Sequence, residues 1–270
     1  RAILLFVLVL SAEAWAHQPE KTRNPVPSKD QQEEVLKVAR QLLDFQVATA
    51  AKKRELAEKL IDLADSAKDK PTEQFTLLKQ ATELARDGGD AALMLRAAEL
   101  IAADFEVDPH KVRETLLVQF AEKAVDGSAL ESLAAQSASV VKQNLAEKRY
   151  PAALALAEAV HKAVQRPAGK NVRKDVLDQL SEVKKQYDRW RPIGAALEKL
   201  RENPDDADAA LVYGKFLCLS EDDYAMGLTY LAKGSDSQLR AIAASDVDLQ
   251  QKDLSAGQSE ALMKAANGWY

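Results

Sequence analysis

Signals that start a helix recur at nearly even spacing through the middle of this chain of 270 residues. Each is a proline suited to a first helical turn, or a short polar residue whose side chain accepts a bond from a free N–H. They stand at Pro71, Asp90, Asp108, Ser128 and Tyr150-Pro151, at intervals of 19, 18, 20 and 22 residues. A helix pair therefore repeats every 37 to 42 residues. Because a pair this short buries its apolar face only by stacking on neighbours, the spacing predicts an array of antiparallel pairs.

Apolar residues between these signals recur in steps of three and four, as in Met94, Ala97, Ile101 and Phe105. Glycine and proline are sparse, and no stretch alternates as a half-buried strand does. We therefore predict an all-α protein in which residues 30–169 form an array of helical hairpins. Residues 30–67 fit either one bent helix or two, since no clear breaker divides them.

Residues 170–201 depart from this rhythm, because one apolar stripe continues through them from Val172 to Leu200. This pattern predicts a single long helix that joins the array to the rest of the chain. Pro192 lies inside the stripe and has no N–H to bond to the carbonyl of Asp188. We expect a kink at this point and not a helix end.

The C-terminal third opens with 34 residues, Asn203 to Asp236, that read as two helices. Pro204 ends one helix, the acidic residues after it cap the next, and each of the two helices carries a small residue, Gly214 or Gly227, where the other can approach closely. This is the length and pattern of a tetratricopeptide repeat, and it completes the prediction of a tetratricopeptide-like solenoid. Residues 202–270 are thus expected to hold one such repeat and then C-terminal helices, the last of which ends without a cap, as a truncated helix would.

Three motifs in this part of the chain carry a resemblance to a known family. They are N-P-D-D at residues 203–206, G-x-F-x-C at 214–218 and G-L-x-x-L-A-K-G-S-D at 227–236. The segment from Asn203 to Val247 resembles the tetratricopeptide-like helical region of a family of exported planctomycete proteins. The resemblance implies an exported helical module. It also implies that lectin-like or other carbohydrate-associated domains would follow such a region, and it carries over no catalytic residue.

The N-terminal residues have the pattern of a signal peptide. Ala2 to Leu10 is an apolar run with basic Arg1 before it, and Ala14-Trp15-Ala16 matches a small-x-small cleavage site. The run is shorter than the ~20 residues of a membrane span, and residue 17 is His and not the Cys of a lipid-anchored protein. We expect residues 1–16 to be removed on export, with no membrane span left afterwards. Residues 17–29 hold three prolines and are expected to be an exposed linker.

Charge and chemistry-bearing residues argue against several classes of function. The 37 basic and 42 acidic residues give a net charge of −5, so nucleic acid is not expected as a partner. Cys218 is the single cysteine, and its apolar surroundings favour a small buried hydrophobe over a nucleophile. The three histidines have no metal-site spacing, and helix capping explains the paired aspartates. We therefore expect no metal, no cofactor and no catalytic residue.

Aromatic residues gather in the last third of the chain. Two explanations stand open for them: packing between the long helix and the repeat, or a groove that binds a peptide or a glycan. The candidate groove residues are Tyr187, Trp190, Tyr213 and Tyr224.

Two classes of function follow from these patterns. The favoured one is a non-catalytic exported module for protein interaction or domain spacing, with a protein or peptide as partner. The alternative is the N-terminal platform of a secreted hydrolase or carbohydrate-binding protein, whose active domain would lie beyond residue 270. The two differ in whether a further domain follows Tyr270.

Overall fold

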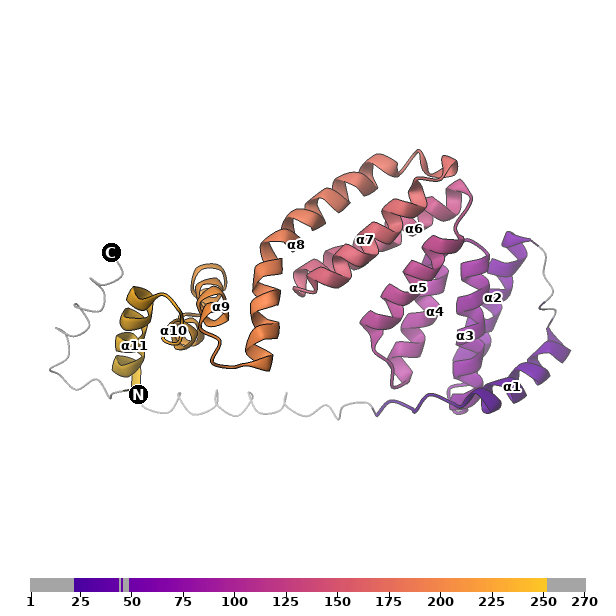
Figure 1. The fold of residues 1–270 in the computed structure, drawn as a ribbon. Helices are drawn as coiled ribbons and strands as arrows, with labels where there is room; N and C mark the ends of the chain where they lie inside the picture. Colours follow the sequence, from indigo (N-terminus) through magenta and orange to yellow (C-terminus); the bar gives the residue numbers. More distant parts are fainter. Residues whose placement is uncertain (1–21, 44, 46–48, 252–270) are drawn as a thin grey trace, which may run out of the picture. The chain divides into compact units, whose positions relative to one another are not determined.

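The computed structural model describes residues 22–43, 45 and 49–251 of the chain, and this part is built from α-helices (Figure 1). The described residues contain no strand, only an isolated bridge between Asn24 and Phe105. The prediction of an all-α protein with neighbouring helices packed in pairs is confirmed. The expected signal peptide at residues 1–16 and the expected final helix up to residue 270 lie outside the described residues.

Eleven α-helices and one short 3-10 helix follow each other in the described residues. The first five are α1 (Lys29–Leu42), α2 (Ala50–Ser66), α3 (Pro71–Asp87), α4 (Ala91–Asp104) and α5 (Pro109–Lys123). Next come α6 (Gly127–Ala146), α7 (Tyr150–Val164), the 3-10 helix η1 (Pro167–Gly169) and α8 (Arg173–Glu202). The last are α9 (Ala207–Ser220), α10 (Tyr224–Leu231) and α11 (Ser237–Gln251). The sequence left open whether residues 30–67 form one helix or two, and the structure has two here, α1 and α2.

The chain divides into two compact units. The first takes the residues up to Val141 together with residues 158–176, and the second takes residues 142–157 together with those from Leu177 onward. The division therefore passes through α6, α7 and α8. The expected segments 30–169, 170–201 and 202–270 stay a prediction.

In the first unit, α2, α3, α4 and α5 pack in sequence order, each against the next, and lie side by side (Figure 1). The starts of α2, α4 and α5 are fixed locally: the side chains of Thr49, Asp90 and Asp108 accept bonds from free N–H groups of the first turn. The core between them is largely apolar and buried, with Phe75 and Phe105 in an edge-to-face contact at 5.0 Å. Stacking of the short helix pairs thus buries apolar surface that a single pair would leave exposed.

The start of α6 differs from the sequence prediction. The helix begins at Gly127, and its capping side chain is Asp126, which accepts from the backbone N–H of Ala129 at 2.8 Å and from the Ser128 hydroxyl at 2.8 Å. Ser128 is therefore inside the helix and is not its cap. An ionised carboxylate is the stronger acceptor at a helix start, which explains why the aspartate takes this place.

Arginine side chains from elsewhere in the first unit close the C-terminal ends of α3, α5 and α7. Arg54 donates to the Gly88 carbonyl at 2.9 Å after α3, and Arg173 donates to three carbonyls at the end of α7 at 3.1–3.2 Å. Arg166 donates to the carbonyls of Ala121 at 2.8 Å, Glu122 at 3.0 Å and Ala124. Helix ends leave unpaired carbonyls and a partial negative charge, so a guanidinium satisfies both.

The described part of the segment expected as an exposed linker is tied to the first unit. Most of its side chains are exposed, but the Asn24 N–H donates to the Asp104 carbonyl at 2.8 Å, and the Glu106 N–H donates to the Asn24 carbonyl at 2.9 Å. These bonds hold the segment against the connection between α4 and α5. The Ser28 side chain and Gln31 then form a capping box that starts α1.

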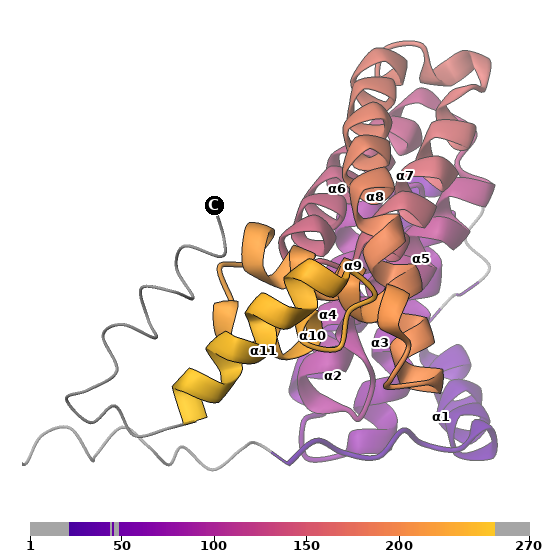
Figure 2. The ribbon, with the colours of Figure 1, turned by 60° about the vertical axis from the view of Figure 1, so that its left-hand side comes forward.

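The second unit contains most of α8 and all of α9, α10 and α11. α8 keeps Pro192 inside it, and Figure 1 shows a bend along its length. α9 packs against α10, and α10 against α11 (Figure 2). Their core holds Cys218, Leu228, Leu231 and Ala243, so Cys218 is the buried hydrophobe that the sequence favoured.

Candidate functional site

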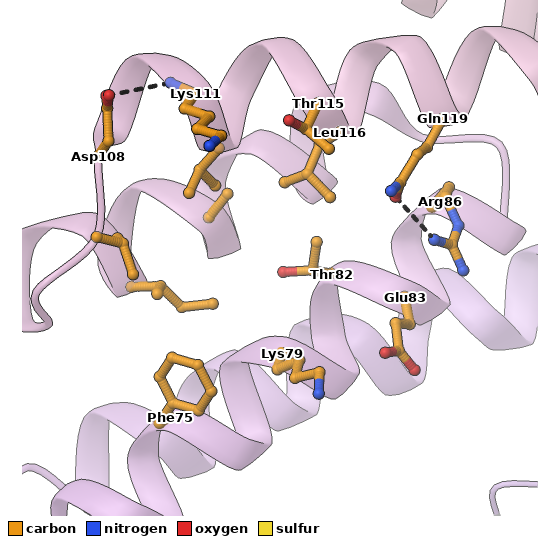
Figure 3. A pocket seen from close by; sticks show the side chains of 14 residues that line it. Phe75, Lys79, Thr82, Glu83, Arg86, Asp108, Lys111, Thr115, Leu116 and Gln119 are labelled. Carbon is orange, nitrogen blue, oxygen red and sulfur yellow. Dashed lines mark hydrogen bonds between the residues drawn. The ribbon is translucent and has the colours of Figure 1, made fainter. Parts of the chain in front are cut away.

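A groove of about 500 Å³ lies between α3 and α5 in the first unit, with α4 beneath it (Figure 3). We call it the α3–α5 groove. Its lining residues are Phe75, Lys79, Thr82, Glu83 and Arg86 of α3, Ala98 and Ile101 of α4, Val107 and Asp108 before α5, and Lys111, Val112, Thr115, Leu116 and Gln119 of α5.

Helical periodicity produces this lining. The α3 positions 75, 79, 82, 83 and 86 recur in steps that keep them on one face of the helix, and the α5 positions do the same. α3 and α5 occupy equivalent places in successive helix pairs, so their facing sides border the same hollow. In Figure 3 the side chains of Lys111 and Leu116 point from α5 towards Thr82 and Phe75 on α3.

The floor of the groove is apolar and its rim is charged. Phe75, Ala98 and Ile101 are buried, and Val112 and Leu116 are half-buried. Around them stand three cations and two carboxylates, which are Lys79, Arg86, Lys111, Glu83 and Asp108. An apolar floor with a few polar groups at its edge is the usual composition of a binding site.

The two rim carboxylates already accept hydrogen bonds inside the protein. Asp108 accepts from the backbone N–H groups of His110 at 2.9 Å and Lys111 at 3.1 Å, and Glu83 accepts from the Gln80 amide. Two of the cations donate to neutral glutamines: Lys79 to Gln32 at 2.8 Å and Arg86 to Gln119 at 3.4 Å. The lining side chains thus carry one more positive than negative charge, and Arg86 also pairs with Asp87, outside the lining, at 3.2 Å.

A carboxylate beside the Arg86 end completes the charge pattern. Partial burial acts to raise the pKa of Asp87, but hydrogen bonds from Lys123 and Arg86, together with their charges, outweigh it and hold this pKa below its usual range. Asp87 is therefore ionised at neutral pH and fixes the direction of the Arg86 side chain at this end of the groove.

The described residues contain no group of three or more His, Cys, Asp or Glu side chains that could hold a metal ion. His110 lies in the first turn of α5, and His161 lies in the last turn of α7, where its ring contacts Gln165 at 3.0 Å. His17 lies outside the described residues. The α3–α5 groove offers contacts for binding, and its lining includes no histidine, cysteine or serine.

The four aromatic residues selected from the sequence fall into separate places in the second unit. Tyr187 and Trp190 are half-buried at 5.9 Å from each other, and Trp190 also packs against Tyr150 at 5.8 Å. Tyr213 is half-buried against Tyr230, at 4.9 Å. No ring contact between described residues joins the two groups.

Tyr213 belongs to the packed interior more than to a surface. Burial raises the pKa of its phenol, with smaller contributions from Tyr230 and nearby carboxylates. Tyr224 at the start of α10 is 56 % exposed, the only one of the four with its side chain largely in solvent. A hollow of about 520 Å³ in this unit, between the end of α8 and α10, includes Tyr230 and none of the four residues.

Sequence reasoning did not find the α3–α5 groove because its residues are ordinary ones for exposed helix faces. The sequence held one usable signal, the order of the helices. α3 and α5 are alternate helices of the repeat, so the boundaries between their polar and apolar faces lie along a common hollow. Aromatic content drew attention to the second unit instead.

A comparison with models of protein families, with curated proteins and with solved structures finds no match for this chain. None of the described helices has both the length and the hydrophobicity that a membrane span requires.

Proposed function

We propose that this chain is a non-catalytic, exported helical-repeat module for protein interaction or domain spacing, whose stacked pairs form a tetratricopeptide-like solenoid. The α3–α5 groove is the observation that carries the proposal. Arrays of helix pairs commonly bind extended or helical segments along the face formed by alternate helices. This groove lies on such a face, with an apolar floor and a charged rim.

The groove fits a short amphipathic helix from a partner protein. Its α3 lining runs from Phe75 to Arg86, a length of about 16 Å at 1.5 Å per residue, which matches three turns of a bound helix. Phe75, Ile101 and Leu116 would take the apolar stripe of that helix. Because the rim cations exceed the rim carboxylates, the flanks of the bound helix would carry aspartate or glutamate.

Selection from a displayed library of random 12-residue peptides tests this function. Peptides selected on the full chain should combine apolar residues at helical spacing with acidic flanks. Their affinity should fall about tenfold with Lys111→Glu, which reverses a rim charge. The matched control is Arg96→Glu, the same charge change at an exposed position of α4 outside the groove, and it should leave affinity unchanged.

Three results would overturn the proposal. One is a selection whose peptides bind equally well to the wild type and to Lys111→Glu. Another is hydrolytic turnover of a substrate by the purified chain, because the module would then be catalytic. For export, cell fractionation with N-terminal sequencing should find a mature chain that begins at His17 outside the cytoplasm, and a cytoplasmic chain that retains residues 1–16 would contradict it.

A further inference from the structure

A second hollow in the first unit lies along α1, the end of α2 and the start of α3. We call it the α1–α2 wedge. Its volume is about 880 Å³. α1 and α2 each pack against α3. The Leu63 residue of α2 is 44 % exposed.

The wedge leaves large apolar side chains in contact with solvent. Val38 and Leu42 of α1 are 57 % and 79 % exposed, and both line the wedge with Leu63. Large apolar side chains that stay exposed beside one hollow are typical of an interaction site.

The charges of the wedge indicate what kind of partner fits it. Its lining includes the carboxylates of Glu34, Asp69 and Glu73, against a single ammonium group, that of Lys70. Lys70 donates to Glu73 at 3.2 Å, and Lys37, outside the lining, donates to Glu34 at 2.6 Å, so the excess negative charge of the wedge centres on Asp69. A partner with positive charge beside its apolar stripe gains attraction here, whereas an acidic one is repelled.

We propose that the α1–α2 wedge docks an amphipathic helix of a partner protein whose flanks carry lysine or arginine. The apolar stripe of that helix would contact Val38, Leu42 and Leu63, and its cations would face Asp69 and Glu73. The wedge runs along α1 from Glu34 to Leu42, about 12 Å, so about two turns of a bound helix occupy it. This site is separate from the α3–α5 groove and takes a partner of opposite charge.

Fluorescence anisotropy of the full chain with designed peptides tests the proposal. The probe is a labelled 14-residue helical peptide with leucine at every third or fourth position and lysine on both flanks. Its comparator has glutamate in place of each lysine. The lysine peptide should bind about tenfold more tightly than the glutamate peptide at low salt, and the ratio should shrink as salt is added.

Variants of exposed residues locate the binding without disturbing the fold. Leu42→Lys should reduce the affinity for the lysine peptide about tenfold, because it removes apolar contact and adds a like charge. Asp69→Lys should reduce the preference for the lysine peptide over the glutamate peptide. The matched control is Val125→Lys, the same type of change at a 71 % exposed residue between α5 and α6, outside the wedge.

Equal affinity for the two peptides, or no binding of the lysine peptide, would overturn the proposal. So would an equal loss of affinity in Leu42→Lys and Val125→Lys. Sedimentation velocity over a range of protein concentrations tests whether a second copy of this chain occupies the wedge instead. A dimer that Leu42→Lys abolishes would assign the wedge to a second copy of this chain and contradict a basic partner helix.

Discussion

Gly214 of α9 and Gly227 of α10 face each other at backbone distance. A Cβ atom on Gly214 would lie 3.0 Å from the Gly227 carbonyl oxygen, and one on Gly227 would lie 3.1 Å from the Gly214 carbonyl oxygen. The same added atom on Gly214 would meet the Leu231 backbone nitrogen at 2.9 Å. Backbone atoms cannot move aside as a side-chain end can, so the approach of the two helices depends on both glycines.

Gly214→Ala should therefore lower the free energy of unfolding by about 1–3 kcal/mol, the usual cost of overpacking. Urea denaturation followed by circular dichroism measures it. Gly127→Ala is the control, because a Cβ at this helical glycine meets only the Ala168 carbonyl oxygen at an ordinary 3.5 Å, and its effect should be neutral or slightly stabilising. Equal destabilisation by the two changes would contradict the close-approach explanation.

Arg166→Met should destabilise the first unit by about 2 kcal/mol, because it removes the guanidinium that bonds to three carbonyls at the end of α5. Thermal unfolding compares it with Arg201→Met. Arg201 pairs with Glu198 at 2.8 Å on the exposed surface of α8, and such a pair contributes little. Equally small effects of the two variants would show that water satisfies the α5 carbonyls as well as the Arg166 guanidinium does.

Acid should weaken the contribution of Asp126 to the start of α6. The Ala129 backbone N–H and then the Ser128 hydroxyl hold the pKa of Asp126 below its usual range. A carboxyl with a lowered folded pKa contributes stability above its unfolded value of about 3.9 and loses it as pH falls through the folded pKa.

Asp126→Ala should accordingly cost about 1 kcal/mol at pH 7, as the loss of a helix cap does. The difference between the wild type and this variant should shrink below about pH 4. Urea titrations at pH 7, 5 and 3 measure it, and a difference that stays constant across this range would exclude a role for the ionised carboxylate.

Trp190→Ala and Tyr224→Ala separate the packing and groove explanations for the aromatic residues. The Trp190 ring lies over Gly194, where an added Cβ would come within 2.6 Å of its Cζ2, and it also packs against Tyr150 and Tyr187. Its removal should cost about 2 kcal/mol or more, whereas removal of the exposed Tyr224 should stay within about 0.5 kcal/mol.

Chemical denaturation gives the stability of both variants, and pulldowns on peptidoglycan, polysaccharide and envelope proteins give their retention. Unchanged stability of Trp190→Ala with selective loss of retention would support a groove at this ring and contradict packing. Loss of stability without selective loss of retention would support packing.

The sequence by itself determined which segments are helical and where most of them start. Asp90 and Asp108 cap α4 and α5 as predicted, and Pro71 opens α3, because capping depends on residues only a few positions apart. The close approach at Gly214 was also predictable, since a small residue among large ones on a helix face lets a neighbouring helix come close. Periodicity within one helix likewise identified the apolar faces that became the core.

Only the tertiary structure decided what lies across those faces. Arg166 and Ala121 are 45 residues apart in the chain, and Asn24 and Asp104 are 80 apart, so no local pattern pairs them. The α3–α5 groove and the α1–α2 wedge arise from the same cause, because each is bordered by three helices whose mutual packing no single helix encodes. Ring content left core packing and a groove as alternatives, and the packing of α7, α8, α9 and α10 placed Trp190 and Tyr213 in separate contacts. Side-chain character is local, whereas the neighbours of a side chain depend on the free energy of the whole packed array.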